Sequence, residues 1–257
     1  MRLSRRELPL RDHSCVQSPT KLPREYVELQ LRLVDKVTGL GRCGVDEAVL
    51  RYTNLPRRFG LEPQDAPMDE RWRHYVDRLQ VLGPLQARVS WTVTFASTFN
   101  QSTSPTSAMS HGPFSAEVID GVVRTHFLPS DDDGLSPLHA SKLALRQQEL
   151  RSVVRQARTA HPEARRIAGA SWLYNSASYR ALFPRAHVRT AVVRTGMTSF
   201  QGSSSWGQFL DHRGGVKENL RQVFLANLAT FDGAEPWRLF PLPTLTVDSP
   251  IEVFDDE

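Results

Sequence analysis

Residues 117–128 read EVIDGVVRTHFL, and this stretch decides what kind of fold the chain can form. Two β-branched pairs, at 118–119 and 122–123, flank the dipeptide Asp120–Gly121. Both residues of that dipeptide tolerate the positive φ angles that a two-residue hairpin turn requires. The stretch therefore predicts a β-hairpin whose second strand continues to Leu128.

A long helix and another strand are predicted after the hairpin. Ser136 and Pro137 form a helix-start signal, because serine can accept hydrogen bonds from free amides and proline fits the first helical position. The helix is expected to end at His161, just before a proline, and residues 166–174 predict a strand. The buried stripe of this helix is expected to contain Leu138, Leu143, Leu150, Val153, Val154 and Ala157.

The C-terminal third continues the alternation of helices and strands. The pattern predicts a short helix over 176–183, a strand over 188–195 and an amphipathic helix over 217–231. A last strand is expected between Leu245 and Val253, and Pro250 should confine it to an edge or break it.

The N-terminal third reads as helical. Apolar residues recur at helical spacing between Tyr26 and Val37, and Gly39 and Gly41 follow this stretch. Asp46 stands where the N-cap of a second helix belongs, and a third helix is predicted around residues 72–79. Residues 88–99, in which large apolar residues alternate with serine and threonine, predict a strand.

The fold class expected from these elements is α+β, in three parts. Residues 1–23 carry three prolines and several basic residues and predict a disordered basic arm. Residues 24–84 predict a helical subdomain, and residues 85–257 predict an αβ domain with a mixed sheet. The segment 100–113 is rich in Ser, Thr and Pro and is expected to be a mobile loop.

Composition narrows the class of protein. The 257 residues are 40% hydrophobic with a formal net charge of +4, and no run is long and apolar enough for a membrane span or a secretory signal. The two cysteines lack CxxC spacing and fit a reducing compartment, so a cytoplasmic protein is expected. The basic residues do not cluster on a recognisable nucleic-acid fold, which argues against a nucleic-acid partner.

The signatures of several enzyme classes are absent from the sequence. It has no Walker A sequence, no GxGxxG after a strand, no HExxH, no CxxC pair and no GxSxG elbow. Phosphate-loop, dinucleotide and metal chemistry are therefore disfavoured, and no metal site is predicted. Small-molecule chemistry, if present, has to rest on other residues.

The first candidate site element is Arg124–Thr125–His126–Phe127, at the end of a strand. Ligands bind beyond the carboxyl ends of strands in open αβ sheets, and a histidine there can act as a general base near neutral pH. His126 is therefore a candidate catalytic base and Arg124 a candidate substrate-binding residue. A histidine hydrogen-bonded within a packed sheet is the structural alternative.

The second candidate element runs from Ser171 to Asn175 and is followed by Arg180. Tyr174 can donate a proton to a leaving group, whereas Ser171, Trp172, Asn175 and Arg180 can orient a substrate. Tryptophan and tyrosine are also large core residues with polar tips, so a purely structural role stays open. The catalytic interpretation requires His126 and Tyr174 to converge on one cleft.

Two further loops contain candidate ligands. Asp131, Asp132 and Asp133 form an acidic loop, which is expected to be a solvated turn rather than a cation site, because no EF-hand spacing follows. Gly214–Gly215 precedes the helix at 217 and can either hold an anion with backbone amides or form an ordinary loop.

The order of these elements, with the histidine-containing strand and the Ser171–Trp172–Leu173 motif, resembles bacterial proteins that join a helical N-terminal domain to a GNAT-like acyltransferase domain. The segment from Arg51 to Leu55 is similar to such proteins as well. The resemblance implies an N-terminal helical bundle packed on a mixed-sheet GNAT-like αβ domain. It also implies transfer of an acyl group from a thioester to an amine or hydroxyl, with His126 as base and Tyr174 as acid.

The resemblance further implies acyl-coenzyme A as the candidate donor, with its pyrophosphate on backbone amides in the segment 129–137. The glycine-rich phosphate signature of GNAT enzymes is absent there, and three aspartates oppose an anion unless a cation intervenes. The competing hypothesis is a non-catalytic partner or regulatory protein, which would use the basic arm and the Ser/Thr-rich loop for contacts. An enzyme of another class, such as a hydrolase, is the third hypothesis.

Overall fold

The computed structural model describes residues 22–98, 109–128, 131, 133–195 and 200–255. Within these residues the fold is α+β, with ten α-helices and one six-stranded mixed sheet. The predicted basic arm lies outside the described residues except for its last two positions, where Leu22 is buried. Most of the predicted mobile loop lies outside them too, but its end forms strand β1.

The helices and strands alternate with short 3-10 turns along the chain. The α-helices are α1 (Arg24–Gly39), α2 (Val45–Tyr52), α3 (Leu55–Arg58), α4 (Glu70–Val81), α5 (Leu85–Ala96), α6 (Leu143–Ala160), α7 (Ala177–Arg180), α8 (Arg185–Val188), α9 (Ser203–Trp206) and α10 (Glu218–Thr230). The strands are β1 (Met109–His111), β2 (Phe114–Ile119), β3 (Val122–Phe127), β4 (Arg166–Ser171), β5 (Val192–Val193) and β6 (Leu245–Pro250). The 3-10 helices are η1 (Ala66–Met68), η2 (Ala140–Lys142), η3 (Trp172–Asn175), η5 (Gly207–Phe209), η6 (Pro236–Leu239) and η7 (Ile251–Phe254).

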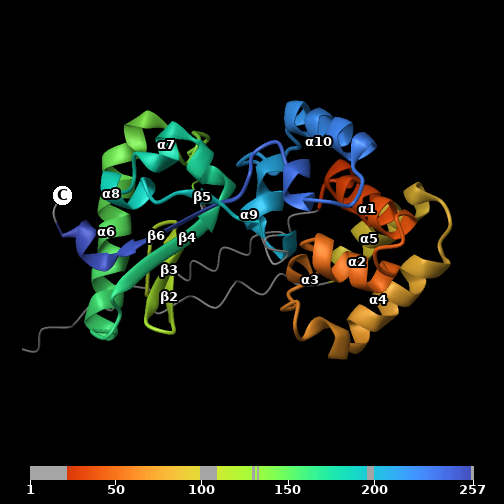
Figure 1. Cartoon of the computed structure of the whole chain (residues 1–257), viewed down its shortest axis with the longest axis horizontal. Helices are drawn as coiled ribbons and strands as arrows, with labels where there is room; N and C mark the ends of the chain where they lie inside the picture. The colour runs from red at the N-terminus through yellow and green to blue at the C-terminus, as the bar shows by residue number, and fades with distance from the viewer. Residues whose placement is uncertain (1–21, 99–108, 129–130, 132, 196–199, 256–257) are drawn as a thin grey trace, which may run out of the picture.

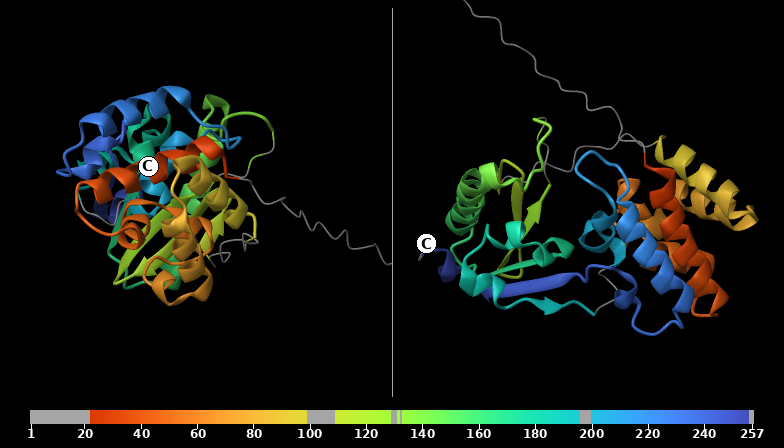
Figure 2. Two further views of the ribbon diagram at one scale, coloured as in Figure 1. Left: turned by 90° about the vertical axis from the view of Figure 1, so that its right-hand side faces the viewer. Right: turned by 90° about the horizontal axis from the view of Figure 1, so that it is seen from above.

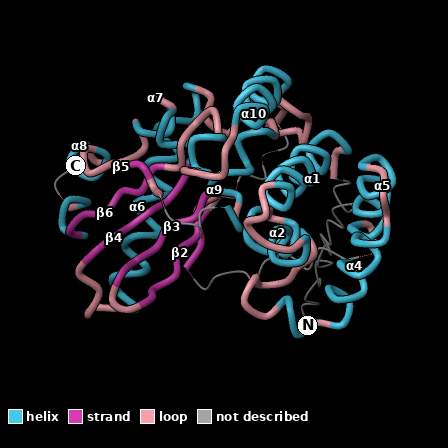
Figure 3. The backbone as a smooth tube through the Cα atoms, turned by 45° about the vertical axis from the view of Figure 1, so that its right-hand side comes forward, coloured by secondary structure: helices cyan, strands magenta, loops and turns pink. Residues whose placement is uncertain are grey.

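The sheet has the strand order β1-β2-β3-β4-β6-β5, and Figure 3 shows its central strands side by side. The predicted hairpin is confirmed: β2 and β3 pair antiparallel, and Asp120 and Gly121 make the turn with φ angles of 53° and 73°. β3 and β4 pair parallel, whereas β4 pairs antiparallel with β6 and β6 with β5. Helix α6 connects the parallel pair, as a crossover helix between parallel strands should.

One face of the sheet forms a hydrophobic cluster with α6. Residues of alternating register on β2, β3 and β4 point to this face, and the buried stripe predicted for α6 is confirmed at Leu150, Val153, Val154 and Ala157. The other face carries mostly exposed polar residues, among them an ion pair between Arg166 and Asp248 at 2.7 Å. The sheet therefore has one packed face and one largely wetted face among the described residues.

A second hydrophobic cluster joins two segments that are far apart in sequence. It contains the N-terminal helices α1, α2, α4 and α5 together with residues 200–240, which include α9 and α10. Figure 1 shows α10 beside α1, at the opposite end of the molecule from α6, and the right-hand view of Figure 2 shows the same separation from above. The helical part is therefore not an N-terminal bundle alone, and the expected boundary at residue 84 does not divide the two clusters.

The strand predicted over residues 88–99 is wrong, because this segment forms α5. Its hydroxyl residues are satisfied within the helix: Ser90 and Thr92 each donate to the carbonyl four residues earlier, at 2.8 Å. Thr92 also lies 3.0 Å from the Tyr75 hydroxyl. Helix α5 packs against both α1 and α4, so apolar residues lie on several of its sides. Along the sequence these residues alternate with serine and threonine, which resembles the two-residue period of a strand.

Several predicted boundaries also shift. Gly44, not Asp46, is the N-cap of α2, and Asp46 lies in the first turn, where a negative charge is still favourable. Helix α6 begins at Leu143 rather than near Ser136, because His139 adopts an extended conformation that interrupts the helix. The strand predicted over 188–195 is reduced to β5.

The two terminal elements are close to the predictions. α10 agrees with the predicted helix over 217–231 to within one residue at each end. Pro250 is the last residue of β6, whose residues beyond Thr246 have no partner in β5 and so lie along an edge. No helix in the described parts of the chain is both long and apolar enough to cross a membrane.

Trp206 connects the two segments of the helical cluster, and its removal is the first test of this arrangement. Its ring is fully buried among Tyr26, Phe224 and Phe240, and its Nε1 donates to the Tyr52 carbonyl at 3.1 Å. We expect Trp206→Ala to lower the free energy of unfolding by about 3–5 kcal/mol, measured by urea denaturation.

The half-buried Trp237, at the edge of the same cluster, provides the matched control. Trp237→Ala should cost clearly less than Trp206→Ala. Equal costs for the two variants would contradict a cluster centred on Trp206.

His187 of α8 provides a pH test of the sheet's packed face. It is fully buried, its Nδ1 lies 2.8 Å from Ser249 Oγ, and burial lowers its pKa to about 4 although Asp248 raises it. The unfolded chain binds this proton below about pH 6.5, whereas the folded chain binds it only near pH 4. The free energy of unfolding should therefore fall by roughly 3 kcal/mol as pH drops through this window.

Urea titrations between pH 7 and pH 4 measure this dependence. His187→Gln should flatten the fall by comparison with wild type, whereas His74→Gln, at an exposed position on α4, should not. Identical profiles for wild type and His187→Gln would show that burial of the imidazole contributes nothing to the acid sensitivity.

Candidate functional site

The candidate site lies at the carboxyl ends of β3 and β4. These ends meet at the same edge of the sheet because the strands are parallel, and ligands of αβ folds bind at such edges. The ladder joins residues 122–124 to residues 166–168 and then stops, although the strands continue to Phe127 and Ser171. The last three residues of each strand are therefore not paired with one another.

Tyr174 lies directly after β4, in η3. Its ring is only 1% exposed and packs on Tyr179 and Phe183, with ring centroids 5.1 and 5.4 Å away. Among the described residues its hydroxyl has no hydrogen-bond partner. Burial, with a smaller contribution from Tyr179, raises the pKa of Tyr174 well above 10, so the phenol keeps its proton at neutral pH.

Gly169 provides the space for this hydroxyl. A Cβ atom at position 169 would lie 2.5 Å from the Tyr174 hydroxyl oxygen, which is too close for a real contact. The backbone of Gly169 does not have a positive φ angle, so glycine is required here by space and not by conformation. Gly169 belongs to the half of β4 that has no ladder with β3, so the hydroxyl reaches β4 where the parallel pairing has ended.

Three of the predicted substrate-binding residues instead hold η3 in place. Ser171 Oγ accepts the Leu173 amide at 3.1 Å and caps the turn, while Asn175 Nδ2 donates to the carbonyls of Trp172 and Pro243 at 2.7 and 2.8 Å. Arg180 donates to the Tyr174 carbonyl at 3.4 Å. These contacts fix the position of the Tyr174 backbone, and the side-chain amide of Asn175 uses its donor nitrogen in both of its bonds.

Trp172 links the sheet to the helical cluster. The ammonium group of Lys217, at the start of α10, lies 4.6 Å from the centroid of the indole ring, a cation–π arrangement. Partial burial lowers the pKa of Lys217, although Asp211 raises it. Trp172 therefore contacts a residue 45 positions later in the chain, and no sequence pattern indicates this pair.

His126 lies on the wetted face of the sheet. Its side chain is half exposed, and its Nε2 lies 3.2 Å from Glu117 Oε1 on the neighbouring strand. Arg124, two residues earlier, shares this face and stands opposite Glu117 in the register. Burial lowers the pKa of Arg194, and the nearby positive charge of Arg124 lowers it further.

His126 and Tyr174 do not meet in a common cleft, so the expected convergence is not found. Residues at 123, 125 and 127 of β3 point to the packed face, which places His126 on the other face, whereas Tyr174 belongs to the packed cluster. Both groups do lie near the ends of β3 and β4, where these two strands no longer pair with each other.

The two described aspartates of the acidic loop belong to an ion-pair network, although Asp133 is also half exposed, as a solvated turn predicts. Lys142 Nζ lies 2.8 Å from Asp133 and 3.4 Å from Asp131, and Arg146 is paired with both Asp131 and Glu149. The Arg146 side chain is 3% exposed, and its pair with Glu149 measures 2.7 Å. Lys142, at the end of η2, and Arg146, in α6, thus balance two of the three negative charges of Asp131, Asp133 and Glu149.

The pKa values of the two loop aspartates reflect this network. Burial raises the pKa of Asp131, but hydrogen bonds from Arg146 and Lys142 outweigh burial and lower it overall. The hydrogen bond from Lys142 is the main cause that lowers the pKa of Asp133. Both carboxylates are therefore ionised at neutral pH and hold the loop onto α6.

The anion-binding interpretation of the second loop is not supported. Asp211 accepts the amides of Arg213 and Gly215, each at 2.8 Å, so a carboxylate of the chain already uses these donors. In the other predicted cradle, residues 129, 130 and 132 lie outside the described part of the chain. Among the described residues, no group of three or more His, Cys, Asp or Glu side chains is placed to hold a metal ion.

No family model, curated protein or solved structure matches the chain. The candidate site is therefore described by its own geometry. Sequence reasoning identified Tyr174 and its neighbours because aromatic and amide residues cluster there. It missed the roles of Gly169, Lys142 and Arg146, since these depend on contacts that no local pattern encodes.

The contact between Gly169 and Tyr174 generates a double-mutant test. Tyr174→Phe should raise the free energy of unfolding by about 1 kcal/mol, because it removes a buried hydroxyl that has no partner among the described residues. Gly169→Ala should lower it by about 1–3 kcal/mol, because the new methyl group meets that hydroxyl.

The two substitutions should couple. Gly169→Ala should cost less in the Tyr174→Phe background than in wild type, as measured by urea denaturation of all four proteins. Additive effects would mean that the hydroxyl does not occupy the space at Gly169.

Proposed function

We propose that the chain is a GNAT-like acyltransferase that moves an acyl group from a thioester donor to an amine or hydroxyl acceptor. The observation that carries the proposal is the buried Tyr174 hydroxyl, which lacks a partner among the described residues and lies where the parallel ladder stops. A buried polar group without a hydrogen bond costs free energy, and a catalytic role is one explanation for such a group.

The topology supports this proposal. An antiparallel set, β1-β2-β3, leads through the crossover helix α6 to the parallel strand β4, in the element order on which the resemblance to GNAT-like domains rests. The family resemblance itself remains part of the proposal, since it rests on element order and a few motifs.

The ends of β3 and β4 do not pair with each other, and this suggests how a donor would bind. A pantetheine chain is extended and carries two amide groups, so it can add to a free strand edge by backbone hydrogen bonding, as peptides do. The thioester at its end would then lie beside Gly169, close to the Tyr174 hydroxyl. Gly169 and Ala170 are small and only partly buried, and they pair with β6 but not with β3.

The chemistry follows from the protonation state of the phenol. The acceptor nitrogen or oxygen attacks the thioester carbonyl carbon, and the carbon–sulfur bond of the resulting tetrahedral intermediate then breaks. The departing thiolate takes the Tyr174 proton, so Tyr174 acts as the general acid. Solvent takes the acceptor proton and returns a proton to Tyr174, because His126 lies on the other face of the sheet and shares no cleft with Tyr174.

The ion-pair network bears on the choice of donor. Lys142 and Arg146 neutralise much of the charge of Asp131 and Asp133, so the repulsion expected from the acidic loop is reduced. The same network leaves few free cations for a pyrophosphate. A donor recognised through its pantetheine arm fits these residues better than one recognised through its diphosphate.

The test compares binding and turnover of acetyl-coenzyme A and S-acetylpantetheine. Binding to the native state should raise the melting temperature with donor concentration, and thiol release should require an added amine or alcohol from an acceptor panel. Tyr174→Phe should reduce thiol release by about 10²–10⁴-fold without loss of stability. His126→Ala, on the other face of the sheet, should leave thiol release unchanged.

Tyr52→Phe, a half-buried tyrosine of the helical cluster, provides the matched control and should retain full activity. Normal turnover in Tyr174→Phe would rule out the acid role. Absence of donor binding would favour the second candidate function, a non-catalytic protein. The ion-pair network favours this second candidate, because Lys142 and Arg146 pair with the carboxylates of the chain and not with a bound ligand.

A further inference from the structure

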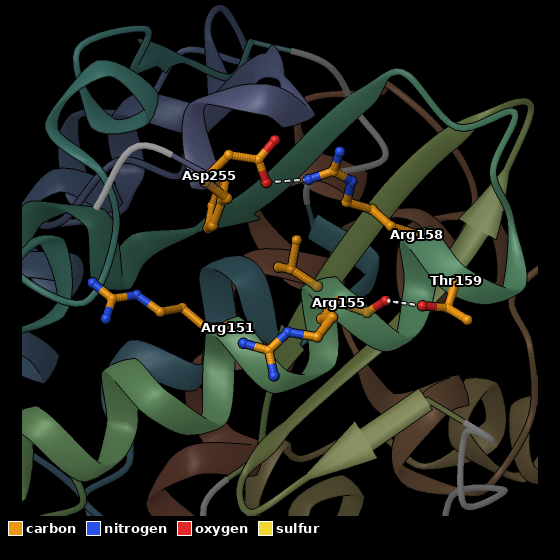
Figure 4. A pocket seen from close by; sticks show the side chains of 7 residues that line it. Arg151, Arg155, Arg158, Thr159 and Asp255 are labelled. Atoms are coloured by element: carbon orange, nitrogen blue, oxygen red, sulfur yellow. Dashed lines mark hydrogen bonds and ion pairs between the residues drawn. The ribbon is translucent and has the colours of Figure 1, made fainter.

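A pocket of about 450 Å³ lies between the C-terminal half of α6 and the chain end at η7. Figure 4 shows Arg158 of α6 extended toward Asp255, with Arg151 and Arg155 reaching outward from the same helix. None of the residues that line the pocket belongs to the ion-pair network of Lys142 and Arg146. The pocket is therefore separate from the ion-pair network and from the candidate acyl-donor site.

The three arginines stand on one face of α6, because their spacing is four and then three residues. Arg158 is paired with Asp255. Within the described residues, no carboxylate pairs with Arg151 or Arg155, and both are exposed. Like charges at this spacing repel each other, so an anion bound between these two guanidinium groups would relieve an existing strain.

The pocket also has an apolar side. Val154 and Phe254 line it and belong to the hydrophobic cluster under the sheet, where they are 3% and 8% exposed. A volume of this size falls in the range of small-molecule sites, which combine apolar walls with a few placed polar groups. A ligand here would present an anionic group to the arginines and an apolar group to Val154 and Phe254.

We propose that this pocket binds a small organic phosphate monoester. Two forked guanidinium groups offer more donors and more charge than one carboxylate needs, and they match a phosphoryl group with two negative charges and three terminal oxygens. Arg151 and Arg155 bind the phosphoryl group, and the organic part packs on Val154 and Phe254. Asp255 limits the site by holding Arg158 away from the ligand.

The proposal is tested by isothermal titration calorimetry with phenyl phosphate at constant ionic strength. Wild type should bind it saturably, and Arg151→Gln/Arg155→Gln should weaken binding at least tenfold. Asp255→Asn should strengthen binding about threefold or more, because it releases Arg158. Arg78→Gln, at an exposed position on α4, is the matched control and should bind like wild type.

The probes also test the chemistry of the site. Benzoate and inorganic phosphate, which each lack one half of the expected ligand, should bind at least tenfold more weakly than phenyl phosphate. Equal binding of all three probes, or unchanged binding by the double arginine variant, would overturn the proposal. Failure of wild type to bind phenyl phosphate saturably would overturn it as well. Thermal melts of each variant should show intact folding, because the side chains of Arg151 and Arg155 are on the surface.

Discussion

The close packing of Tyr174 on Gly169 is the constraint around which the candidate site is arranged. The phenol can reach β4 only because position 169 has no side chain, and it does so where the ladder of β4 with β3 has ended. Ser171, Asn175 and Arg180 hold the turn that carries the ring. The fold thus uses three polar residues to bury one hydroxyl that has no partner among the described residues, and this arrangement calls for a functional explanation.

The two hydrophobic clusters explain how the rest of the chain supports this site. The sheet buries one face against α6, while residues 200–240 return to the N-terminal helices and form a separate core around Trp206. Trp172 and Lys217 connect the two parts close to the site. The helical part therefore acts as a scaffold for the loop after β4, in addition to folding as a core of its own.

Local sequence patterns predict the elements whose cause is local. The Asp120–Gly121 turn and α10 agree with prediction because turn chemistry and helical periodicity are readable within a few residues. The sequence predicts a strand at α5 because the apolar residues of this helix pack against several neighbouring helices. Only the tertiary structure shows these contacts. The ion pairs of Lys142 and Arg146 with the acidic loop escaped prediction for the same reason, since the loop alone reads as a solvated turn.

The most direct test of the account is a crystal structure of the protein with a non-reactive thioether analogue of acetyl-coenzyme A. The account predicts that the analogue's sulfur lies between residues 125–127 of β3 and 169–171 of β4, with the Tyr174 hydroxyl at hydrogen-bonding distance from it. An analogue bound elsewhere, with the Tyr174 hydroxyl still buried away from the sulfur, would contradict the account.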